Sequence, residues 1–167
     1  MQSIKIKQIE TLNSPTHGWL QLPDVLGKIT EFVSSQPDRS YKIIIGTDSQ
    51  NHNGRGTDFV TALVVHRVGG GGVYFWKSYT KKRPYQLKER MYEEALTSIE
   101  FANEFMTALK DSPRLLEIGL EIHVDVGENG KTRDIINEIV AMVRGNGFEV
   151  KIKPDSFGAS KVADRHS

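Results

Sequence analysis

Two aspartates of this 167-residue chain follow segments that are typical of buried β-strands. Asp48 ends the segment Tyr41–Asp48, whose three consecutive isoleucines predict a central strand covered on both faces. Asp125 lies near the end of a second strand, predicted over Ile118–Val126. If these strands are parallel neighbours, about 4.8 Å apart, the carboxylates meet at the sheet edge where α/β proteins bind ligands. Adjacent carboxylates repel one another unless a cation neutralises them, so the pair predicts a site for Mg²⁺ or Mn²⁺.

Two further acids can complete this metal site. A helical period runs from Tyr85 to about Lys110, and Glu94 lies on its apolar side, which must face the sheet. Glu89 and Glu93 project away from that side, so Glu94 is the acid that we expect at the site. The fourth acid is Asp164, on a short helix expected directly after the last strand.

The elements that must position these acids follow from the hydrophobic periods of the chain. Three strands in succession, followed by alternating helices and strands, predict an α/β fold with a mixed sheet. The expected order is β-β-β-α-β-α-β-α, with five strands and an extra N-terminal helix. The predicted elements are a helix over Leu22–Val33, strands over Tyr41–Asp48, Phe59–Val68 and Val73–Tyr79, a helix over 85–110, a strand over Ile118–Val126, a helix over Thr132–Arg144, a strand over Phe148–Lys153 and a short helix over Ala159–Arg165.

Length and composition limit the class of protein. The length fits a single domain over residues 1–167, in which residues 1–40 form an extension with a helix and residues 41–167 form the core. The 22 basic and 21 acidic residues nearly cancel, so net charge alone indicates no partner. The chain has no cysteine, which excludes a disulfide-linked partner and thiolate metal ligands. Without a signal peptide or a long apolar run, we expect a cytoplasmic protein with no membrane contact; the oligomeric state stays open.

A basic segment precedes and begins the long helix. Lysines and arginines alternate there with Trp76, Tyr79 and Tyr85, and such residues neutralise phosphates and stack on unpaired bases. The alternative is a solvated loop and first helical turn. The predicted nucleic-acid-binding residues are Lys81, Lys82, Arg83, Lys88 and Arg90.

Two short motifs carry a family resemblance. The segments Ile45-Gly46-Thr47-Asp48-Ser49-Gln50 and Ala159-Ser160-Lys161-Val162-Ala163-Asp164 resemble the YkuK-like family of bacterial ribonuclease H-like proteins. The resemblance implies a ribonuclease H-like fold and hydrolysis of phosphodiester bonds by two Mg²⁺ or Mn²⁺ ions. It also implies that Asp48, Glu94, Asp125 and Asp164 are both the metal ligands and the catalytic residues.

Two other functions stay open at this point. One is a non-catalytic nucleic-acid-binding or regulatory module that keeps the fold without productive metals, and the other is a metal-dependent phosphatase of a small nucleotide. His123 alternates onto the strand face of Asp125, where it either hydrogen bonds to a metal ligand or is a histidine satisfied within the core. The patterns leave open whether RNA, DNA, a hybrid or a branched structure is cut, and whether cutting is internal or from an end.

Overall fold

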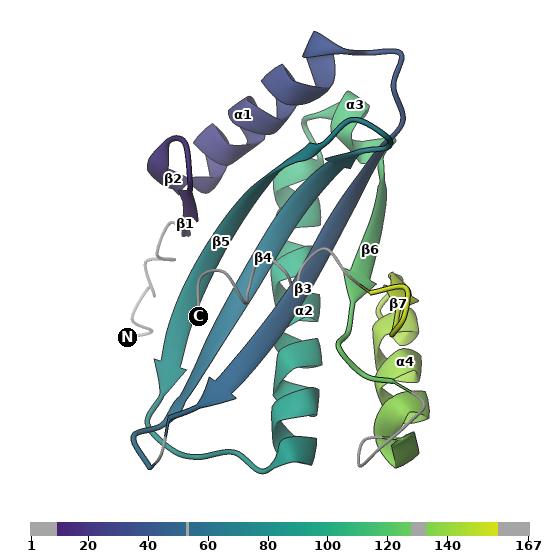
Figure 1. The fold of residues 1–167 in the computed structure, drawn as a ribbon. Coiled ribbons are helices and arrows are strands. Elements are labelled where there is room, and N and C mark those ends of the chain that lie inside the picture. Colours follow the sequence, from purple (N-terminus) through teal and green to yellow (C-terminus); the bar gives the residue numbers. More distant parts are fainter. Residues whose placement is uncertain (1–9, 53, 128–132, 157–167) are drawn as a thin grey trace, which may run out of the picture.

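The computed structural model describes residues 10–52, 54–127 and 133–156, whose strands form one seven-stranded mixed sheet (Figure 1). In chain order, the elements are β1 (Thr11–Ser14), β2 (Gly18–Gln21), α1 (Leu22–Ser35), β3 (Tyr41–Asn51), β4 (Thr57–Arg67), β5 (Gly72–Lys81), α2 (Leu87–Leu109), α3 (Pro113–Leu116), β6 (Gly119–His123), the 3₁₀ turn η1 (Arg133–Ile135), α4 (Ile136–Gly145) and β7 (Glu149–Lys151). The predicted mixed α/β architecture is confirmed.

The sheet is built around an antiparallel meander. Its strand order is β2-β1-β5-β4-β3-β6-β7, in which the pairs from β2 to β3 are antiparallel and β6 is parallel to both β3 and β7. The β4–β5 turn depends on glycine, because Gly69 and Gly71 have φ angles of 73° and 84°. A side chain at Gly72 would come within 2.8 Å of the Val65 carbonyl oxygen, so the hairpin can close only on glycine there.

The helices pack against one face of this sheet. Alternate residues of β3, Ile43 and Ile45, lie in the same apolar core as residues of α1, α2 and α4. Ile44, between them, belongs to a separate small cluster with Ala62 on the other face. In Figure 1, α2 accordingly runs along the back of the meander. Even-numbered residues of β3 therefore point away from α2, which decides the direction of the side chain at position 48.

The N-terminal extension contains more than the predicted helix. The helix is confirmed as α1, with Pro23 in its first turn, but β1 and β2 precede it as an antiparallel hairpin. β1 joins the edge of the sheet at β5 through the pair Asn13 and Trp76, and Leu12 is fully buried in the core. The prediction of five strands is therefore wrong in number, because strands this short have no alternating apolar pattern.

The C-terminal half matches the predicted order with shorter strands. β6 ends at His123 rather than Val126, and β7 ends at Lys151 rather than Lys153. The expected terminal helix, with Asp164, lies outside the described residues. Within the three described ranges, none of the helices is both long and apolar enough to cross a membrane.

Candidate active site

Asp48 and Asp125 lie side by side at the carboxyl end of the two central parallel strands. The last pair in the β3–β6 register is Gly46 and His123. Asp48 and Asp125 each lie two residues later in their chains, so both side chains are on the sheet face that points away from α2. Both carboxylates act on Lys153. Its Nζ lies 2.9 Å from Asp125 Oδ1, and the ion pair with Asp125, together with the charge of Asp48, raises the lysine pKa. The structure thus brings two predicted site residues together and adds a lysine that the sequence patterns do not single out.

Glu94 reaches the same edge from α2. Only 3% of its surface is exposed, which agrees with the apolar side of the helix on which its spacing places it. Ser49 Oγ donates a hydrogen bond of 2.5 Å to Glu94 Oε1. The other oxygen, Oε2, is buried and has no hydrogen-bond partner among the described residues. Such an orphaned acceptor is costly to bury, so it marks a position where a ligand would be stabilising.

The electrostatics of Glu94 reflect this environment. Burial, above all, raises the pKa of Glu94 to about 8, and the negative charges of Asp48 and Asp125 act in the same direction. The hydrogen bond from Ser49 and the positive charge of Arg90 oppose the shift without cancelling it. A buried acid with a raised pKa beside two other carboxylates is the pattern expected of a site that lacks a neutralising cation.

A buried hydroxyl network fixes α2 against the sheet next to Glu94. Thr47 Oγ1 lies 2.9 Å from Thr61 Oγ1 on β4 and 2.9 Å from Ser98 Oγ on α2. Ser98 is one helical turn after Glu94, so the network sets the height and rotation of the helix at the acid. The sequence pattern places Ser98 on the buried stripe, but its polar contacts depend on a strand distant in the chain.

The carboxylates of Asp48, Glu94 and Asp125 suit a hard divalent cation, but the described residues do not form a complete set of metal ligands. Carboxylates are the oxygen ligands that Mg²⁺ and Mn²⁺ prefer, and Glu94 Oε2 offers an unused acceptor. Asp164, the fourth predicted acid, lies outside the described residues. In the part of the chain that the structure describes, no group of three or more histidine, aspartate or glutamate side chains is arranged to hold a metal ion.

His123 belongs to a second polar cluster farther along the same sheet face. Its Nε2 lies 3.0 Å from Glu121 Oε2, and Lys42 Nζ lies 3.3 Å from the other oxygen of Glu121. Burial lowers the pKa of His123, against the opposing effect of Glu121. His123 Nε2 is thus engaged with an acid of its own strand.

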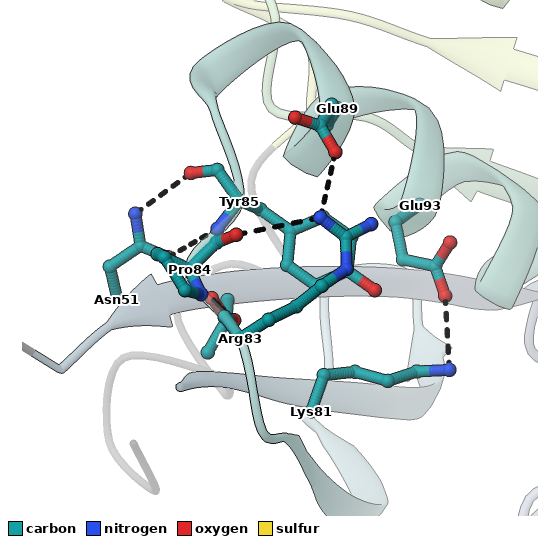
Figure 2. Close-up of polar contacts among 8 residues, drawn as sticks. Asn51, Lys81, Arg83, Pro84, Tyr85, Glu89 and Glu93 are labelled. Atoms are coloured by element: carbon teal, nitrogen blue, oxygen red, sulfur yellow. Dashed lines mark hydrogen bonds and ion pairs between the residues drawn. The ribbon is translucent and has the colours of Figure 1, made fainter. Parts of the chain in front are cut away.

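Three of the five predicted basic residues form ion pairs with acids in the structure. Arg83 Nη1 lies 2.9 Å from Glu89 Oε2, and Lys81 Nζ lies 3.9 Å from Glu93 Oε1 (Figure 2). The Arg83 guanidinium also lies over the Tyr85 ring, 3.7 Å from its centroid. Farther along α2, Lys88 pairs with Asp134 at 2.7 Å, and Lys82 is exposed.

Arg90 differs from the other basic residues of this segment. Its Nε is buried and, within the described ranges, has no hydrogen-bond partner. It lies one helical turn before Glu94 and lowers the pKa of that acid through its charge. The segment therefore combines exposed ion pairs with one arginine that lies close to the carboxylates.

Three comparisons with known proteins each show a similarity. A protein-family model described as "Ribonuclease H-like" matches residues 24–167 of the chain. A protein of Bacillus subtilis (strain 168), named "Uncharacterized protein YkuK", is 37% identical over 152 residues, which cover 85% of this chain and 88% of that protein. The crystal structure of Ciona intestinalis Endonuclease V, in complex with a 24mer DNA containing an inosine followed by a ribo-adenosine, is similar with a TM-score of 0.36 and 16% identity. That match covers 84% of this chain and 66% of that protein.

Proposed function

Because this chain belongs to the ribonuclease H-like family, we propose that it is a divalent-metal-dependent nuclease that hydrolyses phosphodiester bonds of nucleic acid. The observation that carries the proposal is the buried Glu94, whose Oε2 is unpartnered within the described residues and whose pKa is raised by burial and by the two nearby aspartates. A protein gains nothing in stability from three acids at one edge of its sheet, so their convergence is best explained by a bound cation.

The ligands of the proposed ions are Asp48, Glu94 and Asp125, with Asp164 as the fourth. Two Mg²⁺ or Mn²⁺ ions bound there would lower the pKa of an attacking water and stabilise the leaving 3′ oxygen of the cleaved strand. The chain's own contribution is orientation. Ser49 holds one oxygen of Glu94 by its 2.5 Å hydrogen bond, which leaves Oε2 directed to a ligand.

The basic segment at the start of α2 is the proposed contact to the nucleic-acid backbone. Its ion pairs at Lys81, Arg83 and Lys88 lie on the surface, where such pairs contribute little to stability and can be exchanged for phosphate contacts. Lys82 is exposed and can contact a phosphate directly. Arg90, one helical turn before Glu94, is the proposed contact to a phosphate close to the bond that would be cut.

The ion pair at Asp125 favours a second candidate function. The Lys153 ammonium already neutralises this carboxylate at 2.9 Å, so the edge can persist without metal. A non-catalytic nucleic-acid-binding or regulatory module on the same fold would use the basic segment alone. The nuclease would lose cleavage when Asp48 is replaced, whereas the non-catalytic module would cleave no substrate at all.

The test is a panel of labelled RNA, DNA, hybrid and branched substrates with Mg²⁺ and with Mn²⁺. We expect metal-dependent cleavage of at least one substrate by the wild type and none by Asp48→Asn, because the carboxamide cannot supply the lost charge. Asp38→Asn is the matched control, since Asp38 is an exposed residue in the loop before β3, at the other end of the strand. Full activity of Asp48→Asn would reject the assignment. Binding of nucleic acid without cleavage of any substrate would favour the second candidate.

A further inference from the structure

Lys153 places a positive charge directly at the proposed metal site. Its Nζ lies 2.9 Å from Asp125 Oδ1, at the distance of a charge-assisted hydrogen bond. The charge of Asp48 also acts on this lysine, which therefore lies close to both aspartates. Glu94, the third acid, keeps an unpartnered buried oxygen within the described ranges. The lysine thus neutralises the charge of Asp125, whereas Glu94 Oε2 has no hydrogen-bond partner among the described residues.

The backbone of Lys153 is fixed beside Asp125. The Lys153 N–H donates to the Val126 carbonyl at 2.9 Å, and the Val124 N–H donates to the Lys151 carbonyl at 2.9 Å, so two backbone hydrogen bonds flank the aspartate. The lysine stem runs along the chain at Gly127, where a side chain would lie 3.6 Å from Lys153 Cβ and 3.8 Å from Cδ. This ion pair is therefore specified by the fold.

The ammonium group of Lys153 can nevertheless move away from the Asp125 carboxylate. The side chain of Lys153 is 57% exposed and that of Asp125 is 31% exposed, so rotation of the lysine toward solvent opens no core contact. An ammonium and a divalent cation at the same carboxylate repel each other, and the repulsion between neighbouring charges is strong at a partly buried edge. Each of the two cations therefore weakens the binding of the other at Asp125.

We propose that Lys153 is an internal cation of this site, which holds Asp125 in the metal-free protein and competes with the divalent ion for its carboxylate. The inference rests on the proposed function, because it takes the ion to bind at Asp48, Glu94 and Asp125. Metal binding then works against the positive charge of the lysine, so Lys153 lowers the metal affinity of the site and acts as a positioning residue for Asp125.

The competition is tested by titrating Mn²⁺ into the full-length protein without nucleic acid and following free Mn²⁺ by electron paramagnetic resonance. Removing the ammonium in Lys153→Met should tighten Mn²⁺ binding by about tenfold, because a competing ion pair and a repelling charge are both lost. The matched control is Lys151→Met, on the same side of the extended chain two residues earlier, where the lysine lines a separate groove with Glu121 and His123. Its affinity should stay within about twofold of the wild type, because its charge does not contact Asp125. Lys153→Arg, which keeps the charge, should not bind Mn²⁺ more tightly.

Each outcome separates this inference from the proposed function. If the wild type binds Mn²⁺ and Lys153→Met binds it equally or more weakly, the competition is overturned while the metal site stands. Equal tightening in the two methionine variants would reveal a general charge effect and would also overturn the competition. If neither the wild type nor Lys153→Met binds Mn²⁺, both proposals fall. Far-ultraviolet circular dichroism verifies that each variant is folded, and Lys153→Gln replaces Lys153→Met if the latter is not.

Discussion

At the scale of single residues, Glu94 carries the largest electrostatic cost in the site. The residue is 3% exposed, its carboxyl accepts a hydrogen bond from Ser49, and the negative charges of Asp48 and Asp125 act on it. This cost is avoided by protonation, because its pKa of about 8 lies above neutrality. In the proposed function a divalent cation would remove the same cost by supplying positive charge, so that proton and metal would be alternative ligands of this side chain.

This environment predicts how stability depends on pH in EDTA. The folded pKa of Glu94 is about 8 against its ordinary value of 4.5, so the folded state holds the proton more tightly and stability decreases as pH rises between these values. From pH 5 to pH 9 the loss attributable to this group is about 4 kcal/mol. Glu94→Gln should remove that loss and unfold at higher urea than the wild type at pH 9. Parallel pH profiles of the two proteins would contradict the raised pKa.

At the scale of elements, α2 and β3 are joined by hydroxyl groups as well as by apolar packing. Thr47 sits between Thr61 and Ser98, so it serves both the β3–β4 pair and the helix. All three residues are at most 6% exposed, so each hydroxyl relies on the others for hydrogen bonding. The helix that carries Glu94 is thereby held in one rotation relative to the strand that carries Asp48.

The hydroxyl network predicts that the substitutions Thr47→Val and Ser98→Ala lower the free energy of unfolding by different amounts. Thr47→Val leaves two buried hydroxyls short of a partner and should lower the free energy of unfolding by about 2–4 kcal/mol, whereas Ser98→Ala should cost about 1–2 kcal/mol. Urea unfolding at pH 7 measures both. If Ser98→Ala were as costly as Thr47→Val, Thr47 would not be the centre of the network.

Helices and strands with a strong hydrophobic period could be predicted from the sequence, whereas elements without such a period could not. The apolar stripe of α2 predicts that Glu94 lies toward the sheet, and the isoleucines of β3 predict a strand covered on both faces. β1 and β2 have four residues each, and they are ordered by pairing with each other and with Trp76, far away in the chain. Lys153 lies beyond the end of β7, so its ion pair with Asp125 follows from the tertiary fold and from no local pattern.

At the scale of the whole molecule, charge is balanced rather than concentrated. The formal net charge is +1, and Lys81, Arg83 and Lys88 each face an acid. The sequence predicts where basic residues cluster, but the acids that pair with them, in the first two turns of α2 and in η1, are identified only by the structure. Nucleic acid bound at this segment would have to replace these ion pairs, and the release of counterions from its phosphates would make binding dependent on salt.

Replacing Lys81, Lys82 and Arg83 together by alanine should weaken nucleic-acid binding and reduce the slope of log K against log salt by about 2 to 3. Fluorescence anisotropy of a labelled oligonucleotide, measured over a series of KCl concentrations, gives this slope. A double alanine variant of Lys28 and Lys110, on other elements, should leave it unchanged. An unaltered slope in the triple variant would place the nucleic acid on another surface.

The convergence of acids at the edge of β3 and β6 is tested most directly by anomalous diffraction from a crystal grown with Mn²⁺. We predict an anomalous peak at about 2.0–2.3 Å from Glu94 Oε2, shared with a carboxylate oxygen of Asp48 or Asp125, as expected for oxygen ligands of such an ion. A map in which Mn²⁺ binds elsewhere, while Glu94 Oε2 stays without a ligand and Lys153 stays on Asp125, would contradict the account.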